Sequence, residues 1–285
     1  MKIAFFGTPE IAQIVLDELK LANILPDLII TNPDAPVGRK QILTPPPVKV
    51  WAEANNIAII QPKTLKDSTL VPELANSDWD LFLVVAYGKI LPPWLLTLPK
   101  CGTLNVHPSL LPKLRGASPI RSAILNDERE TGVTIMLMDN ELDHGPILSQ
   151  TVTQIPAENW PILGTDLDLT MAQQGGAMLA DLIPKYIAGE IKPTPQDHTK
   201  ATFCTKISKE MSELNINPYQ LPSGKEAYQI LLKIRAFDGW PETFFIYENK
   251  RYKIKQAKLD ENGKLNILRV VPEGKTETDF SLCFR

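Results

Sequence analysis

The chain has 285 residues, of which 44% are hydrophobic and 22% are charged, so it is long enough for one or two globular domains with a sizeable core. Its formal net charge is −3, which excludes a protein that binds nucleic acid through overall basic charge. The charge is uneven, because residues 201–285 hold 14 Lys and Arg against 11 Asp and Glu. Any nucleic-acid partner must therefore be held by local basic patches.

Cysteine spacing and hydropathy predict a soluble, cytoplasmic chain. The three cysteines lie far apart without a Cys-X-X-Cys pair, which argues against a disulfide framework or a zinc site. The N-terminus has about five apolar residues before a Gly-Thr-Pro break, fewer than the roughly 7–15 of a secretory signal. No stretch approaches the ~20 apolar residues of a membrane span. We therefore expect neither a bound metal nor a membrane segment.

Short apolar runs alternate with amphipathic segments through the first two-thirds of the chain. The runs predict strands, and the segments with apolar residues at helical spacing predict helices. This alternation is typical of an open, mostly parallel α/β sheet, in which the very apolar run at 80–87 is expected to be a central strand. In chain order, strands are expected at 2–6, 27–31, 57–60, 80–87, 102–107 and 132–139, and helices after Thr8 and at 48–56, 119–128 and 165–187.

The pattern changes after about residue 190. Residues 191–205 show no clear period and are expected to be a linker. One amphipathic helix is expected at 225–237, followed by alternating residues with Glu-Asn and Glu-Asn-Gly turn signals, which predict antiparallel β structure. We therefore expect an α/β domain over 1–190, a linker over 191–205 and a smaller β-rich domain over 206–285.

The first strand-to-helix turn, at residues 7–10, reads Gly-Thr-Pro-Glu and contains a single glycine. A dinucleotide site needs G-x-G-x-x-G, so the turn argues against NAD. Thr8 is expected to cap the helix that follows. Such a helix start can bind a small anion, and a tight turn with a capped helix explains the same residues.

Three polar residues stand near the ends of two expected strands. Asn105 and His107 lie two residues apart and so project from the same face of a strand. Asp143 follows the strand at 132–139 in a loop that also holds Asp139. An amide donor, an imidazole and a carboxylate suit acid–base chemistry on a substrate that brings its own amine. From residue types alone, a capped strand end and turn aspartates explain the same pattern.

The segments LNVHPSLLPKLRGASPI and MDNELDHGPIL together resemble the folate-dependent formyltransferase superfamily. Its motifs Asn-X-His, Ser-Leu-Leu-Pro, Arg-Gly and Leu-Asp-X-Gly appear in order. The resemblance implies transfer of a formyl group from 10-formyltetrahydrofolate to an amine. It implies that His107 hydrogen-bonds the oxyanion and moves a proton, that Asn105 is a second donor, and that Asp143 orients the imidazole and raises its pKa. The folate would bind at Ser109, Leu110, Leu111 and Pro112, with a pterin slot, or an ordinary turn, around Tyr87, Gly88, Ile90 and Leu91.

Four further segments resemble the branch of this superfamily that formylates methionyl initiator tRNA. They are FFGTPEIA, NPDAPVGRKQILTPPPVKVWA, LVVAYGKILPPWLL and KIRAFDGWPETFF. The resemblance implies a Rossmann-like domain, a C-terminal OB-like β-barrel that binds tRNA, and a monomer. The sequence departs from the branch at LNINPYQLPSGKEAYQ, and it ends at DFSLCFR, earlier than many relatives.

Two basic segments are expected to contact the tRNA backbone. The loop at 32–47 carries Arg39 and Lys40 and is long for an α/β connection, where roughly 2–6 residues are usual. Arg251, Lys253 and Lys255 alternate and would share one face of a strand. A solvated loop and an edge strand protected by lysines have the same composition.

Two other functions remain open. One is formylation of a small amine, such as an amino-sugar nucleotide or glycinamide ribonucleotide, against which the long basic loop and the RAFDGWP segment argue. The other is a non-catalytic RNA-binding relative, against which the intact Asn105, His107 and Asp143 argue.

Overall fold

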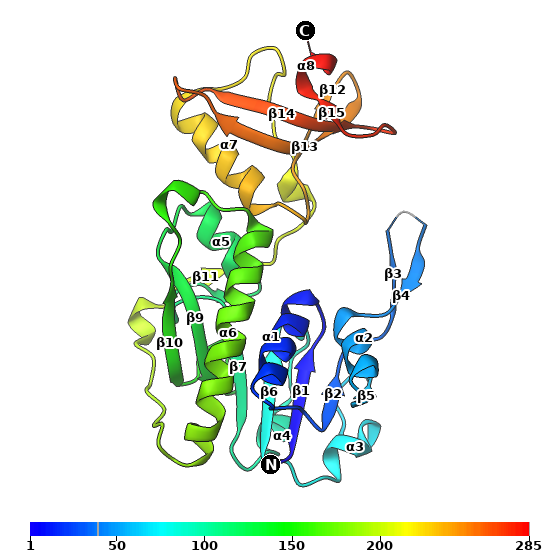
Figure 1. Ribbon diagram of the computed structural model, residues 1–285, viewed down its shortest axis with the longest axis vertical. Helices are drawn as coiled ribbons and strands as arrows, with labels where there is room; N and C mark the ends of the chain where they lie inside the picture. Colours follow the sequence, from blue (N-terminus) through cyan, green and yellow to red (C-terminus); the bar gives the residue numbers. More distant parts are fainter. Residues whose placement is uncertain (39, 285) are drawn as a thin grey trace. The chain divides into compact units, whose positions relative to one another are not determined.

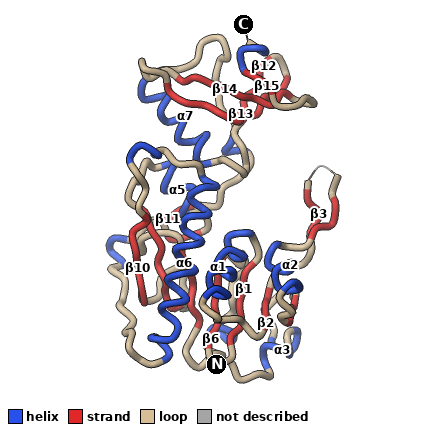
Figure 2. The backbone as a smooth tube through the Cα atoms, viewed as in Figure 1, coloured by secondary structure: helices blue, strands red, loops and turns tan. Residues whose placement is uncertain are grey.

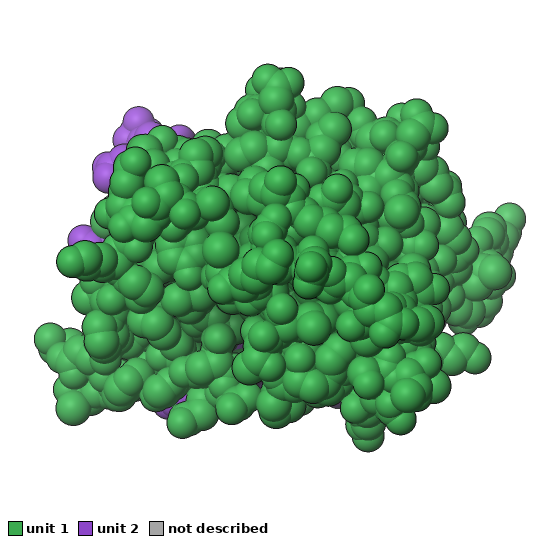
Figure 3. Space-filling model, turned by 90° about the horizontal axis from the view of Figure 1, so that it is seen from below, with its two compact units in different colours: residues 1–115, 132–153, 169–202 green, residues 116–131, 154–168, 203–285 purple. Residues whose placement is uncertain are grey.

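The computed structural model describes residues 1–38 and 40–284 and is drawn in Figure 1 and Figure 2. The chain forms two compact units, whose residues are coloured separately in Figure 3. Unit 1 holds residues 1–115, 132–153 and 169–202, and unit 2 holds residues 116–131, 154–168 and 203–285. The domain boundaries expected from composition stay a prediction. No helix in the described part of the chain has the length and apolar character needed to cross a membrane.

Unit 1 is built on a seven-stranded sheet of order β10-β9-β7-β6-β1-β2-β5. The five strands from β7 to β5 pair in parallel, whereas β9 runs antiparallel to β7, which confirms the open, mostly parallel sheet. All residues of β6 are buried at the middle of this order, as expected for the central strand. The strands are β1 (Ile3–Gly7), β2 (Leu28–Ile30), β5 (Ala58–Ile60), β6 (Leu81–Val85), β7 (Thr103–His107), β9 (Thr131–Leu137) and β10 (Ile147–Thr153).

Two helices cover the same face of this sheet, as Figure 1 shows. They are α1 (Glu10–Leu21) and α6 (Gly164–Ile187). A Cβ at Gly175 of α6 would lie 2.6 Å from Val106 of β7, and one at Gly176 would lie 2.6 Å from Glu18 of α1. These glycines therefore let α6 approach the sheet and α1 closely. Because Val106 faces α6, its neighbours in β7 face the opposite side of the sheet.

The expected Thr8 cap of α1 is wrong. The cap position is taken by Pro9 in an extended conformation, without a side-chain cap. The Thr8 hydroxyl instead donates to the carbonyl of Tyr87 at 3.3 Å, because it turns toward the segment that follows β6.

The long basic loop contains a β-hairpin that the sequence did not predict. Its strands β3 (Ala35–Val37) and β4 (Ile42–Thr44) are antiparallel, and all their residues are exposed. Figure 1 shows this hairpin standing away from the sheet of unit 1. Arg39 lies outside the described residues.

Unit 2 contains a four-stranded antiparallel sheet of order β12-β13-β14-β15 packed on α7 (Gly224–Ala236). Leu231 and Ile234 of α7 share a core with Phe245, Ile254 and Ile267 of the sheet. This confirms a C-terminal antiparallel β domain, and the OB-like barrel stays a prediction. The strands are β12 (Phe244–Tyr247), β13 (Lys250–Leu259), β14 (Leu265–Pro272) and β15 (Thr278–Asp279).

The remaining elements are short. The helices are α2 (Pro47–Ala54), α3 (Pro72–Ala75), α4 (Pro93–Leu96), α5 (Pro119–Leu125) and α8 (Phe280–Cys283). The strands are β8 (Arg115–Gly116) and β11 (Phe203–Cys204). The 3-10 turns are η1 (Ser68–Leu70), η2 (Ala157–Asn159), η3 (His198–Lys200) and η4 (Glu210–Ser212).

Candidate active site

The candidate site lies at the carboxyl edge of the parallel strands in unit 1. The register pairs Gly7 with Val85 and Val84 with Asn105, so β1, β6 and β7 end at the same edge. His107 is the last residue of β7, and Asn105 stands one step before it on the same face, opposite α6. Ligands of open α/β sheets bind at this edge.

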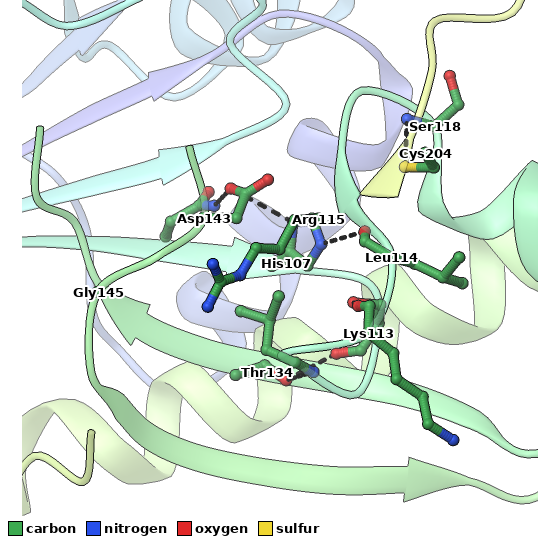
Figure 4. Close-up of polar contacts among 12 residues, drawn as sticks. His107, Lys113, Leu114, Arg115, Ser118, Thr134, Asp143, Gly145 and Cys204 are labelled. Carbon is green, nitrogen blue, oxygen red and sulfur yellow. Dashed lines mark hydrogen bonds and ion pairs between the residues drawn. The ribbon is translucent and has the colours of Figure 1, made fainter. Parts of the chain in front are cut away.

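Asp143 reaches this site although the strand before it runs the other way. Since β9 is antiparallel, its last residue Leu137 pairs with Leu104 at the start of β7. The β9–β10 loop then folds back, and Asp143 Oδ1 lies 3.5 Å from Asn105 Nδ2 and 3.7 Å from His107 Nδ1 (Figure 4). The structure therefore brings the three predicted residues together.

Local backbone geometry allows this loop to turn. Asp143 has a φ of 48°, in the left-handed region that aspartate tolerates better than most residues. Gly145 lies so close to β9 that a Cβ there would collide with the carbonyl oxygen of Leu137. The Leu-Asp-X-Gly pattern of the sequence thus corresponds to a loop that needs its glycine.

The His107 imidazole is neutral and has a defined tautomer. Its Nε2 lies 3.1 Å from the carbonyl oxygen of Leu114, which can only accept, so Nε2 carries the proton and donates. The lone pair of the neutral ring is then on Nδ1, toward Asp143. Burial lowers the pKa of His107 below its ordinary value, although Asp143 and the Leu114 carbonyl act to raise it, and Arg115 lowers it further. The expected pKa rise caused by Asp143 is thus outweighed by burial.

The second loop carboxylate has a different partner. Asp139 Oδ2 lies 2.7 Å from His144 Nδ1, and the His144 ring stacks on the ring of His198 at 4.0 Å. All three histidines of the chain therefore lie in this region of unit 1, and the carboxylate beside His107 is that of Asp143. In the described residues, no group of three His, Cys, Asp or Glu side chains is placed to hold a metal ion.

The Ser-Leu-Leu-Pro segment after β7 is fixed by a dense set of hydrogen bonds. The buried Thr134 hydroxyl donates to the carbonyl of Ser109 at 2.6 Å and accepts from the amide of Leu111 at 3.2 Å. Gln150 donates to the carbonyl of Leu111 at 2.9 Å. Ser109 and Leu111 are buried, whereas Leu110 and Pro112 are half-buried. The segment therefore offers a ligand a rigid surface beside His107.

The turn after β6 offers mainly its backbone. The side chains of Tyr87 and Leu91 belong to the core, and burial raises the pKa of Tyr87 to about 12. Gly88 has a φ of 79°, and the side chain of Ile90 is 92% exposed. Asn32 donates to the carbonyl of Tyr87 at 3.0 Å. Of the predicted pterin-slot side chains, only that of Ile90 is open to solvent in the described structure.

The predicted RNA-contact residues lie in different surroundings. Lys40 is exposed, and Arg251 is exposed with its guanidinium over an aromatic ring. Lys253 and Lys255 lie 2.5 Å and 2.6 Å from the two carboxylate oxygens of Glu242. A ladder irregularity lies between Ile254 and Gln256, so strict alternation along β13 is broken near these lysines. Part of the expected positive charge is therefore paired within unit 2.

Sequence reasoning missed two polar residues that contact the Asp143 loop. Gln196, inside the expected linker, donates to the carbonyls of Asp143 at 2.9 Å and Gly145 at 2.7 Å. Arg115 donates in turn to Gln196 at 2.6 Å. Arg115 could have been noticed as part of the Arg-Gly motif, whereas nothing around Gln196 in the sequence marks it.

Comparisons with known proteins agree with this site. A family model described as formyl transferase matches residues 1–161, and one described as formyl transferase, C-terminal domain, matches residues 219–278. The methionyl-tRNA formyltransferase of Halalkalibacterium halodurans is 41% identical over 254 residues, which is 89% of this chain and 77% of that protein. That of Staphylococcus aureus is 40% identical over 265 residues, or 93% and 82% of the two chains.

Solved structures show the same fold at lower identity. A 4-N formyltransferase from Francisella tularensis has a TM-score of 0.63 at 19% identity and covers 87% of this chain and 93% of its own. A methionyl-tRNA formyltransferase from Clostridium thermocellum has a TM-score of 0.61 at 18% identity, with 95% and 98% covered. Since one family model matches more than half of the residues and the curated relatives are about 40% identical over most of their length, the chain belongs to the formyltransferase family, among the methionyl-tRNA formyltransferases.

Proposed function

We infer that this chain transfers the formyl group of 10-formyltetrahydrofolate to the amino group of methionyl initiator tRNA. The product is the N-formylmethionyl-tRNA of translation initiation. The observation that carries this function is the identity of about 40% with enzymes of that name along nine-tenths of the chain. The cluster of Asn105, His107 and Asp143 supplies matching chemistry at the sheet edge. The enzyme acts in the cytoplasm as a monomer.

His107 is the proton acceptor of the reaction. The neutral α-amino nitrogen attacks the formyl carbon, which forms the new C–N bond and makes that nitrogen cationic. Nδ1 of His107 has the lone pair that takes its proton, because Nε2 already donates to Leu114. The Asp143 carboxylate, 3.7 Å away, is too distant for a direct hydrogen bond and stabilises the imidazolium by charge. The proton then passes to the folate nitrogen as its bond to the formyl carbon breaks.

Asn105 stabilises the oxyanion that forms at the formyl oxygen. Its Nδ2 lies 3.5 Å from Asp143, at the limit of a hydrogen bond, so it can turn to a stronger acceptor. Once His107 is protonated, its Nδ1–H is a second donor beside Asn105. Loss of one such donor costs ~10²–10³ in rate.

The folate donor binds between two segments at the same edge. Residues 109–112 and the backbone of 87–91 follow neighbouring parallel strands and flank His107. Peptide groups and apolar side chains suit a flat heterocycle with several donors and acceptors. Both segments are held by internal hydrogen bonds, which favours a preformed slot.

Basic residues of both units bind the tRNA backbone. Arg39 and Lys40 belong to the hairpin segment, and Arg251, Lys253 and Lys255 belong to β13. Phosphate contacts of this kind supply affinity that falls with salt and carries no base sequence information. Glu242 pairs with two of these lysines, so RNA phosphates must compete with its carboxylate.

The test is a radiolabelled formyl-transfer assay with three acceptors. They are methionyl initiator tRNA, free methionine and a sugar nucleotide that carries a free amine, each with 10-formyltetrahydrofolate. We expect label in the tRNA alone, and none with a His107→Ala variant. Label in the sugar nucleotide would replace the proposed acceptor, and tRNA binding without transfer would indicate a non-catalytic relative.

A further inference from the structure

The loop that presents Asp143 depends on contacts from outside its own sequence. It must run back along β7 from the far end of β9, and it includes a non-glycine residue at positive φ. Such a conformation persists only where the surroundings determine it. Two carbonyl groups of this loop, those of Asp143 and Gly145, point to the same partner, Gln196.

We infer that Gln196 is a positioning residue that holds the Asp143 carboxylate against His107. One amide nitrogen bridges the carbonyls on both sides of His144, at 2.9 Å and 2.7 Å, and so fixes the turn that aims Asp143. Gln196 is buried, so these bonds are not exchanged for water without cost. The inference rests on the proposed function for its kinetic part, because it concerns the proton acceptor of that reaction.

Arg115 sets the orientation of the Gln196 amide. Its Nε and Nη2 lie 3.2 Å and 2.6 Å from Gln196 Oε1, and a guanidinium can only donate. The oxygen of Gln196 must therefore face Arg115, which turns the amide nitrogen toward the loop. Arg115 is buried and also donates to His198 Nδ1 at 2.9 Å, so its guanidinium is fixed from two sides.

The distances in the site make it sensitive to this support. Asp143 acts on His107 across 3.7 Å without a short hydrogen bond between them. The other groups that act on the imidazole are the Leu114 carbonyl and Arg115, so Asp143 is the one carboxylate among its printed influences. A displacement of about 1 Å can cost ~10² in rate when it affects the geometry of a reacting group.

The test compares Gln196→Ala with Gln174→Ala. Gln174 is a matched control, because its amide nitrogen also donates to two carbonyls of unit 1, those of Thr151 and Val152, away from the site. We expect Gln196→Ala to lower kcat by ~10² while KM for folate and for tRNA changes less than about threefold. Gln174→Ala should leave kcat and both KM values within about threefold of the parent.

A second readout needs no substrate. The chain has three histidines, so an NMR titration can follow the His107 imidazole separately. Because Asp143 raises the pKa of His107, its displacement in Gln196→Ala should lower that pKa further, whereas Gln174→Ala should leave it unchanged. A chain that formylated no tRNA would refute the proposed function, and the titration would still decide this inference.

Gln196→Met covers the case in which the alanine variant fails to fold. Methionine fills a similar volume and cannot donate to the two carbonyls. A folded Gln196→Met protein with kcat within threefold and an unchanged His107 titration would overturn the inference. An equal loss of kcat in Gln174→Ala would overturn it too, because the effect would then be one of general stability.

Discussion

Replacement of Asp143 by asparagine removes the charge beside His107 and retains the shape of the side chain. At 3.7 Å, the attraction between a carboxylate and an imidazolium is about 4 kcal/mol for an effective dielectric constant of ~20, and about 1 kcal/mol for that of water. The side chains are 5% and 12% exposed, which places the pair between these limits. If about 3 kcal/mol is lost as the imidazolium forms, the rate falls by ~10², since each 1.36 kcal/mol is a factor of ten.

The assay is single-turnover formyl transfer measured from pH 5 to 9. Asp143→Asn should lower the rate by ~10² at neutral pH and flatten the pH profile, because an amide cannot stabilise an imidazolium. Asp139→Asn is the matched control from the same loop, and its loss should stay below about threefold, since Asp139 contacts His144. A normal rate in Asp143→Asn together with a large loss in Asp139→Asn would refute this assignment.

Three further predictions follow from the geometry. His107→Ala should lower kcat by ~10²–10⁴ without changing the dissociation constant for folate, and turnover within threefold of the parent would remove His107 from the mechanism. Burial depresses the pKa of His107, so the unfolded chain takes up a proton first and stability should fall as pH drops below about 6.5; urea unfolding at pH 7 and pH 5 should show this loss, and His107→Gln should reduce it. Lys253→Ala and Lys255→Ala should raise KM for tRNA, leave kcat unchanged and make the salt dependence shallower by about one unit per contact. Glu242→Gln should lower that KM, because it frees both lysines, and weaker binding by this variant would contradict the phosphate role.

Much of the fold could be predicted because the signals for its strands and helices are local. The run at 80–87 is apolar on both faces, and it forms the buried β6 at the middle of the sheet. The helix expected at 165–187 is α6, within a residue at its start. The Thr8 cap failed for a tertiary reason, since the hydroxyl donates to a residue far along the chain.

The site was predicted in composition and not in construction. Residue types and the family resemblance selected Asn105, His107 and Asp143, and the structure places them within hydrogen-bonding or ion-pair range. The route of the Asp143 loop depends on the antiparallel direction of β9, which no local pattern encodes. The supporting Gln196 stands in a segment without periodicity, so its contacts appear only once the chain is folded.

The hairpin of β3 and β4 separates what the protein recognises from what keeps it folded. Val37, Ile42 and Leu43 are 56%, 61% and 66% exposed, and none of the strand residues belongs to the core. Substitutions on such a surface usually change the free energy of unfolding by less than about 0.5 kcal/mol. Natural variation can therefore alter this ribbon freely without bringing the enzyme nearer to its stability threshold. Adaptation to a new acceptor stem could then proceed through many neutral steps there, while the sheet and its catalytic edge remain unchanged.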